Sequence, residues 1–463
     1  MCLQLIRSLR MTGFELRLRR YSRKMSKTSS RYRTLIYLLS WVSISVVASV
    51  VGAGVVFLLI SSSEAIINLA FSLSIPWYAL TLAGALVYGF VLRRIVRGVR
   101  DEGVSSYIAG VTTQDGHFTL RQTLAKLVGA VVSLGTLANV GLIAPAGRIS
   151  AGVVSRIVSA WLHISGGKGR DTNAGSAIRY TRTAAIAGMA SAAGIVAGAP
   201  IAGGIFAVEI LEKANMRYSD LFPAILASAT ASFLSRYIGR PGLFSFDVPD
   251  ARWSISLIGA VALTAVLAGL AGRLYGEIYR RTHALARRVR YPALMLFAAS
   301  AVSVLLAVVT VPGIIGRSEG LGDALIAGNL EVLSIAWAPW MPIVVIALLA
   351  AVAKATANSI TVATGMSGGF TGPTIVVGVL LAVAVQSVLG LSFRDPEGVA
   401  VGVAGVAGML ASSANVPITA IVLVTERFGV SYGVAGAMGA IIGFQINRHH
   451  MLYEQARDHA AED

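Results

Sequence analysis

Long apolar stretches fill most of the chain, and short polar or charged segments separate them. A helix needs about 20 apolar residues to cross the hydrocarbon core of a bilayer. Several stretches are shorter than this, and others are interrupted by glycine or proline. The pattern predicts an all-α polytopic membrane protein that mixes full and partial spans, because broken helices at membrane depth must line an enclosed or water-filled cavity. The stretches are Tyr37–Ile60, Pro76–Val91, Leu124–Pro145, Ala184–Ile210, Leu221–Leu234, Ile255–Leu270, Leu294–Val311, Ile335–Val352, Ile375–Leu391, Val399–Val424 and Val430–Ile446.

The composition excludes a soluble monomer, a disordered chain and a coiled coil. Of the 463 residues, 55% are hydrophobic and 13% are charged, and a soluble domain carries roughly twice that charged fraction. The 49 glycines indicate closely packed or broken helices. Cys2 is the only cysteine, so we expect neither a disulfide framework nor a cysteine-based metal site.

The net charge is strongly positive, at 39 − 22 = +17. Such a charge often indicates nucleic-acid binding, but here the basic residues lie at the ends of apolar segments. Residues 1–33 hold ten Lys and Arg residues and one acid, Glu15. This segment is too long and too basic for a signal peptide, and we interpret it as a cytosolic arm held near anionic lipid. No nucleic-acid partner is expected.

Charged loops predict the orientation, since cytosolic loops are enriched in Lys and Arg. Basic clusters follow the second and the sixth apolar stretches, whereas the segment 317–331 is acidic on balance and is expected outside the cell. Both termini then lie in the cytosol, and a multi-pass position in the plasma membrane is expected. The basic clusters are Arg93, Arg94, Arg97 and Arg100, and Arg280, Arg281, Arg287, Arg288 and Arg290; the outer segment holds Arg317, Glu319, Asp323 and Glu331.

The chain contains an internal repeat. A lysine precedes a proline by 19 positions in each half, as Lys126 and Pro145 and as Lys354 and Pro373. A second pair of segments, Gly188–Glu209 and Gly405–Glu426, has a proline 12 positions after its first glycine and a glutamate nine positions after that proline. Matched elements in the same order are typical of transporters built from two inverted halves around a midplane pathway.

The repeat divides the chain into parts. We expect a basic N-terminal arm at 1–33, a transmembrane domain at 34–447 with halves at about 34–240 and 250–447, and a short cytosolic tail at 448–463. The tail is too short to bury a core of its own.

Two glycine-rich segments begin apolar helices with a proline in the first turn, Gly141–Pro145 and Gly368–Pro373. Helix N-termini carry unpaired N–H groups and about half a positive charge. Several such termini that converge within a membrane form an anion site without a buried cation. The alternative is a pair of tight helix-packing turns.

The sequence resembles the CLC family of chloride channels and chloride/proton antiporters over roughly residues 34–455. The third signature, GGxFxP, and the second-half stretch Pro417–Glu426 are the specific ones, although Thr371 stands where the family has Phe in the third signature. The family signatures GSGIP, GREGP with its following QIGAG, GGxFxP and FNAPIAGxxFxxE fall on Asp101–Ser105, on Gly141–Pro145 with Arg148–Gly152, on Gly368–Pro373 and on Ala197–Glu209.

The departures from the family pattern concern proton transport. The resemblance places the gating, proton-carrying glutamate of GREGP at Ile143 and the preceding arginine at Leu142. It places the inner proton glutamate at Ile210, directly after Glu209. No Asp or Glu lies between Asp115 and Asp171, so a small shift of the alignment would not restore a gate. Anion movement without proton exchange is therefore implied.

The central anion site is also altered. The family serine of GSGIP falls on Glu102, whose carboxylate would repel chloride unless it is protonated or faces the vestibule; Ser105 or Ser106 could supply the hydroxyl instead. The tyrosine of the last family helix is best matched by Tyr453, for which an interfacial anchor is the alternative. The implied anion-binding residues are Glu102, Gly103, Ser105, Leu142, Ile143, Ala144, Phe370, Thr371, Gly372 and Tyr453.

The leading hypothesis is passive transport of chloride or a similar anion through a pore in each subunit of a homodimer, with no enzymatic activity, cofactor or metal. One alternative is a proton-coupled antiporter that uses Glu102 and Glu209 as its proton route. Another is a membrane scaffold that has lost transport. An intramembrane serine protease is a weaker candidate, because Gly365–Gly368 contains Ser367 in a G-x-S-G pattern but the six histidines lie in or beside polar segments. The pair His449–His450 lacks further metal ligands.

Overall fold

The computed structural model describes residues 38–95, 102–166, 174–211, 216–237, 251–289, 291–450 and 452–453. The chain separates into two units, 1–44 and 45–463, and the first is described only at 38–44. The arm at 1–33, Asp101, Arg97, Arg100, Arg290 and the tail beyond Tyr453 lie outside the described residues.

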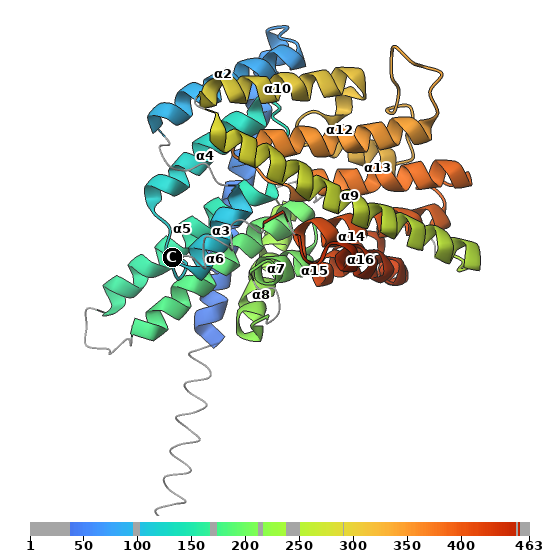
Figure 1. Cartoon of the computed structure of the whole chain (residues 1–463). Coiled ribbons are helices and arrows are strands. Elements are labelled where there is room, and N and C mark those ends of the chain that lie inside the picture. Colours follow the sequence, from blue (N-terminus) through green and yellow to red (C-terminus); the bar gives the residue numbers. More distant parts are fainter. Residues whose placement is uncertain are drawn as a thin grey trace, which may run out of the picture. The chain divides into compact units, whose positions relative to one another are not determined.

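The described residues form helices joined by turns, with one isolated β-bridge (Figure 1). Within the part of the chain that the structure describes, five helices are long and apolar enough to cross a membrane: Leu38–Ser72, α9, α12, α13 and α14. In chain order after Leu38–Ser72 the elements are α2 (Trp77–Ile95), α3 (Gly103–Thr112), α4 (Leu120–Gly135), α5 (Ile143–Gly166), α6 (Ala174–Ala197), α7 (Pro200–Glu209), α8 (Tyr218–Tyr237), α9 (Ile255–Arg288), α10 (Pro292–Val309), η1 (Pro312–Ile314), α11 (Glu319–Ile326), α12 (Ile343–Ala363), α13 (Thr371–Leu389), α14 (Pro396–Ala414), α15 (Pro417–Phe428), η2 (Val430–Tyr432) and α16 (Gly433–Asn447).

The mixture of full and partial spans is confirmed. Helices α3 and α7 have 10 residues each, which gives a length of about 15 Å. The hydrocarbon core is about 30 Å thick, so neither helix can cross it. Helix α7 ends among buried residues at Glu209, whereas α3 begins at buried Gly103 and ends at exposed Thr112.

Two predicted stretches are each divided into two helices. The stretch Val399–Val424 contains a break between α14 and α15, where Asn415 has φ of 61° and Pro417 begins the next helix. Ala184–Ile210 breaks in the same way between α6 and α7, at Gly198, just before Pro200. Proline disfavours the helical conformation of the residue before it, so each break falls where the sequence places Pro.

Helix α9 is longer than its apolar stretch indicates. It continues from Leu270 to Arg288, so the basic segment expected as a loop is helical over its described part. Glu277 forms ion pairs with Arg280 at 2.7 Å and Arg281 at 2.5 Å. Pairs three and four residues apart stabilise a helix outside an apolar environment, so these pairs contribute to the added turns.

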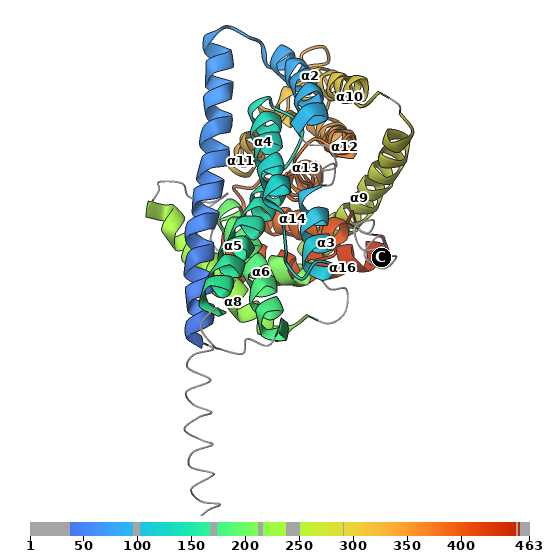
Figure 2. The ribbon, with the colours of Figure 1, turned by 90° about the vertical axis from the view of Figure 1, so that its left-hand side faces the viewer.

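The two halves of the described fold repeat each other. In the first half α4, α5, α6 and α7 pack in succession, and in the second half α12, α13, α14 and α15 do the same (Figure 1). Corresponding helices also meet across the halves, in the pairs α2 with α10, α5 with α13, and α7 with α15. Figure 2 shows α5 and α6 next to each other and α13 and α14 deeper within the second unit.

Reciprocal hydrogen bonds join α7 to α15. The N–H groups of Ile418 and Thr419, at the start of α15, donate to the Glu209 carboxylate at 2.9 and 2.8 Å. At the start of α7, the N–H groups of Ile201 and Ala202 donate to Glu426 at 2.9 Å each. Each glutamate therefore caps the helix of the opposite half and neutralises its N-terminal partial charge. The equal Pro-to-Glu spacing of the two repeats is the sequence signature of this exchange.

Candidate functional site

Two glycine-rich segments meet directly in front of α5 and α13. Gly141 and Gly369 form an antiparallel bridge in which each N–H donates to the other carbonyl, at 2.8 and 3.1 Å. Helix α5 begins two residues after Gly141, and α13 begins two residues after Gly369. The bridge therefore holds the two helix N-termini together, as the repeat predicts for a midplane site.

The N-terminus of α3 reaches the same place. The Gly103 N–H points to the Gly368 carbonyl at 3.5 Å, and a Cβ on Gly103 would lie 2.5 Å from the Ala144 carbonyl oxygen. Only glycine permits so close an approach of two backbones. The first-turn N–H groups of α3, α5 and α13 have no intrahelical acceptors. We call the place where these three helix N-termini meet the junction. Because the positive ends of three helices converge there, the junction can hold an anion.

A buried lysine forms hydrogen bonds with the segment around Asn139, which precedes α5. Lys354 on α12 is fully buried, and its ammonium donates to Asn139 Oδ1 and to the carbonyls of Ile314 and Gly316 at 3.0 and 2.7 Å. All three ammonium protons therefore have acceptors, which is what a buried charge requires. The lysine ties residues from both halves of the chain together.

A neighbouring asparagine connects this lysine site to the glycine bridge. Asn358 Nδ2 donates to the Asn139 carbonyl at 2.6 Å and to the Gly369 carbonyl at 3.3 Å. Its Oδ1 accepts a hydrogen bond from the Tyr275 hydroxyl on α9. The position of Gly369 is thus fixed by polar contacts from α12 as well as by Gly141.

An aromatic cluster closes one side of the junction. The Phe370 ring contacts Tyr275, Tyr279 and Tyr453 in edge-to-face arrangements, with ring centroids 6.0, 4.7 and 5.9 Å apart. The Tyr453 hydroxyl lies 3.4 Å from Thr371 Oγ1, at the first residue of α13. Tyr453 is 1% exposed, so it is a buried residue beside the junction and not an interfacial anchor.

Glu102 lies inside the protein at the N-cap of α3 and is 3% exposed. Its Oε2 accepts a hydrogen bond from the Ser105 N–H at 2.8 Å, while its Oε1 is buried without a hydrogen-bond partner. This burial contradicts the alternative in which the Glu102 carboxylate faces a solvated vestibule. Lys126 on α4 acts on this carboxylate as an opposite charge.

The two serines considered as substitutes have other contacts. Ser105 uses its N–H to bind Glu102, and the Ser106 hydroxyl accepts a hydrogen bond from Arg148 Nε at 2.9 Å. Arg148 is 2% exposed, and its guanidinium lies 3.9 Å from the centre of the Phe118 ring. This places a buried cation on the second turn of α5, next to α3.

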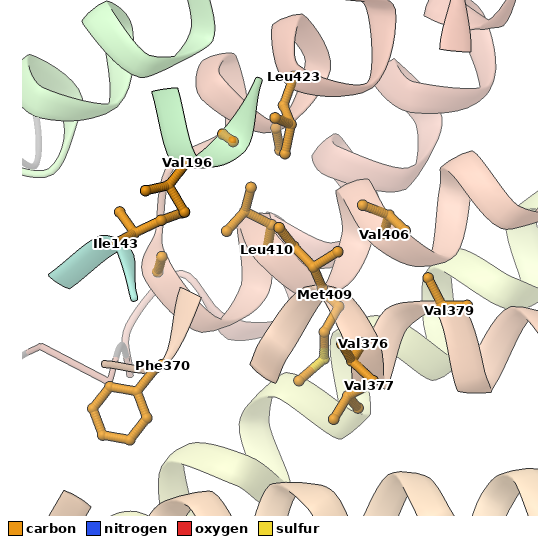
Figure 3. Packing of buried hydrophobic residues seen from close by; sticks show 14 of the residues in the cluster. Ile143, Val196, Phe370, Val376, Val377, Val379, Val406, Met409, Leu410 and Leu423 are labelled. Atoms are coloured by element: carbon orange, nitrogen blue, oxygen red, sulfur yellow. The ribbon is translucent and has the colours of Figure 1, made fainter. Parts of the chain in front are cut away.

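The residues at the two expected proton positions are buried and aliphatic. Ile143 is the first residue of α5, and with its neighbours Leu142 and Ala144 it belongs to the same apolar cluster as Phe370 (Figure 3). Ile210 follows the last residue of α7 and is also buried. Gly372 lies in the first turn of α13 beside Thr371. The junction therefore brings together the expected anion-site residues from α3, α5, α13 and Tyr453, while Ile210 lies apart from them at the C-terminal end of α7.

Several residues around the junction were not expected from the sequence. They are Asn139, Arg148, Tyr275 and Asn358, together with the contacts of Lys354. A charged or amide side chain within an apolar stretch is by default a functional candidate, and that signal would have selected Asn139, inside Leu124–Pro145. Arg148, Lys354 and Asn358 fall just beyond the ends of the predicted stretches.

Substitution of Gly369 by alanine should disrupt the junction. A Cβ at this position would overlap the Cβ of Ala144 and would lie 2.9 Å from Glu102 Oε1. We expect overpacking to cost about 2 kcal/mol of unfolding free energy, visible as a lower midpoint in thermal unfolding of the purified protein. The matched variant is Gly372→Ala, since a Cβ there meets only the Gly141 Cα at 3.8 Å. Equal midpoints for the two variants would contradict the close contact at Gly369.

These features define a multi-span membrane protein whose broken helices meet at an anion-compatible site. A sequence profile of the family described as Voltage gated chloride channel matches residues 83–448. The chain belongs to this CLC family, which transports chloride and related anions across membranes and consists of channels and transporters.

Curated relatives match along most of their length. A chloride/fluoride channel protein of Pseudomonas syringae pv. tomato is 25% identical over 442 residues, which cover 91% of this chain and 87% of the relative. The voltage-gated ClC-type chloride channel ClcB of Escherichia coli is 26% identical, with 87% and 91% covered.

Solved structures show the same fold at lower identity. The crystal structure of a CLC-type fluoride/proton antiporter matches with a TM-score of 0.70 at 20% identity, covering 90% of this chain and 96% of that chain. A slow cyanobacterial Cl−/H+ antiporter matches with a TM-score of 0.70 at 16% identity, covering 92% and 98%. The similar proteins thus include channels and antiporters.

Proposed function

We propose that this protein moves chloride or a similar anion passively through a pathway in each subunit, without exchanging protons. The single observation that carries the proposal is that Ile143 and Ile210 stand at the two proton positions of the family pattern. An isoleucine side chain has no group that can bind a proton. Ile143 begins α5 in the junction, so the place expected for a gate holds an alkyl group.

The competing candidate is a proton-coupled antiporter that uses Glu102 and Glu209. The buried Glu102 carboxylate, with its unpartnered Oε1, favours this candidate. Glu209 argues against it, because its carboxylate accepts three hydrogen bonds from the start of α15 and serves as the helix cap. A proton carrier at Glu209 would have to give up that cap in each transport cycle.

The test is an efflux assay with the purified full-length chain in liposomes under a chloride gradient. We expect chloride to leave, as followed by a chloride electrode, without proton uptake at a fixed ratio, as followed by external pH. A proton uptake that stays in constant proportion to chloride efflux would reject the uncoupled mechanism. Vesicles that contain the protein but release no chloride at any pH would favour the scaffold alternative.

A homodimer is proposed as the working assembly. Dimers are typical of the family. Helices α7, α8, α15 and α16 also expose large apolar side chains, and small residues let membrane helices pack closely. A single protomer mass in detergent, together with no cross-linked dimer in vesicles, would contradict this assembly. The exposed side chains are Ile201, Phe222, Phe233, Ile418, Val434 and Ile441.

We also propose a location in the plasma membrane with both termini in the cytosol. The support is the charge distribution of the sequence, with basic segments on one side and the segment 317–331 on the other. A reporter fused to the N-terminus should be protected from an external protease in intact cells. A cysteine introduced at Glu331 should react with an impermeant thiol reagent from outside.

A further inference from the structure

The Glu102 carboxylate lies within the junction of the three helix N-termini. Its Oε2 caps α3 through the Ser105 N–H, and its Oε1 would lie 2.9 Å from a Cβ placed on Gly369. Gly369 lies two residues before the start of α13 and forms the bridge in front of α5. A negatively charged oxygen is therefore held where the positive ends of three helices meet.

The two oxygens of the Glu102 carboxylate differ in their hydrogen bonds. A helix cap needs a single acceptor, and Oε2 supplies it. Oε1 is buried without a hydrogen-bond partner, which is costly for an anionic oxygen unless it has another role.

Few charged or titratable groups face Glu102. Lys126 on α4 attracts its carboxylate, and the Tyr453 hydroxyl interacts with it electrostatically from the C-terminal turn. On α3 the Ser105 N–H donates to it, and the polar side chain at the start of α13 is Thr371, beside Tyr453. On α5 the cation Arg148 is engaged with Ser106. None of these groups is a carboxylate that would share a proton with Glu102.

We propose that the Glu102 carboxylate is a built-in anion that competes with chloride for the helix N-termini of the junction, so that neutralising it opens the pathway. This inference rests on the proposed function and adds a regulation to it. The charged side chain occupies the site when it is deprotonated. Protonation removes both its attraction to the helix N-termini and its repulsion of chloride, so transport should be activated by acid.

The decisive variant is Glu102→Gln, because Gln keeps the size of the side chain and an oxygen that can cap the Ser105 N–H. Glu102→Ser is the second variant, since Ser is a good N-cap and leaves space. The matched control is Glu426→Gln, which alters a carboxylate that caps α7 away from the junction. Size-exclusion profiles establish that each variant is folded.

Anion efflux from proteoliposomes is measured between pH 7.5 and 5.0 with symmetrical internal and external pH. We expect efflux through the unaltered protein and through Glu426→Gln to rise at least tenfold over this range. Efflux through Glu102→Gln should be independent of pH and at least as fast as the unaltered protein at pH 5.0. In titration calorimetry at pH 7.5, Glu102→Gln should bind chloride at least tenfold more tightly.

An unchanged pH profile in both Glu102→Gln and Glu102→Ser would overturn the proposal, as would equal chloride affinities at pH 7.5. Potassium efflux in preference to chloride, abolished by Glu102→Ser, would overturn it as well. If no variant moves chloride, the proposed function fails. The calorimetry then decides the present inference separately, because tighter chloride binding by Glu102→Gln would still support the competition.

Discussion

Replacing Ile143 with glutamate should close the pathway at neutral pH. The new carboxylate would lie at the first residue of α5, where the helix N-terminus stabilises a negative charge by up to about 2 kcal/mol in partly buried positions. That free energy corresponds to about a thirty-fold preference for the closed state, since 1.4 kcal/mol is a factor of ten. Chloride efflux from proteoliposomes should fall by about that factor and recover in acid as the glutamate is protonated.

Ile143→Gln is the control, because it has the size of glutamate without the charge. It should lose far less efflux at neutral pH and show no added recovery in acid. Both variants are best compared in a Glu102→Gln background as well, which separates the new carboxylate from the existing one. Equal efflux through the glutamate and glutamine variants would mean that the start of α5 does not contact the permeating anion.

Replacing Lys354 with methionine should destabilise the protein and weaken transport together. Three buried acceptors would lose their donor: Asn139 Oδ1 and the carbonyls of Ile314 and Gly316. Each unsatisfied buried acceptor costs about 1–3 kcal/mol, and removal of the buried ammonium offsets part of this loss. We expect a net loss of about 3 kcal/mol, measured as a lower midpoint of thermal unfolding in detergent.

The matched control for Lys354 is Glu319→Gln. Glu319 attracts the ammonium electrostatically and forms a partly exposed pair with Arg317 at 3.7 Å. A pair of this kind is worth about 0–1 kcal/mol. A loss in Glu319→Gln as large as in Lys354→Met would mean that charge pairing, and not the three hydrogen bonds, holds this region together.

The transport consequence of Lys354→Met follows from the contacts of Asn139. Its carbonyl accepts from Asn358, and Asn358 also donates to the Gly369 carbonyl. A shift of Asn139 would therefore reach the glycine bridge that holds α5 and α13. Normal efflux in a destabilised Lys354→Met protein would separate the lysine contacts from the geometry of the site.

Much of the helical order could be predicted from the sequence because it depends on local patterns. The lengths of the apolar stretches predicted the full spans. Proline marked the starts of helices inside the protein, at Pro145, Pro200, Pro373 and Pro417. Helix α9 extends beyond the apolar stretch that predicted it. Its turns after Leu270 contain the ion pairs of Glu277, and the length of an apolar stretch gives no information on such pairs.

The candidate site could be predicted only in part. Glycine-rich helix starts and the positions of Ile143 and Thr371 follow from motifs. Tyr453 contacts Thr371, which lies 82 positions earlier in the chain. This contact depends on how the C-terminal segment packs against α14, where the Leu452 N–H donates to the Ser413 carbonyl at 3.0 Å. Such long-range contacts leave no periodic signal in a single sequence.

The sequence alone determined that this is a membrane protein of two repeated halves, because hydropathy and repeat spacing are properties of the chain itself. It also determined that Ile143 and Ile210 are aliphatic, at the positions where the family resemblance implies proton-carrying glutamates. Only the tertiary structure decided that Glu102 is buried. Its surroundings are contributed by α3, α4, Gly369 and Tyr453. Burial and electrostatic contacts of one side chain depend on segments far away in sequence, and these come together only when the two halves pack.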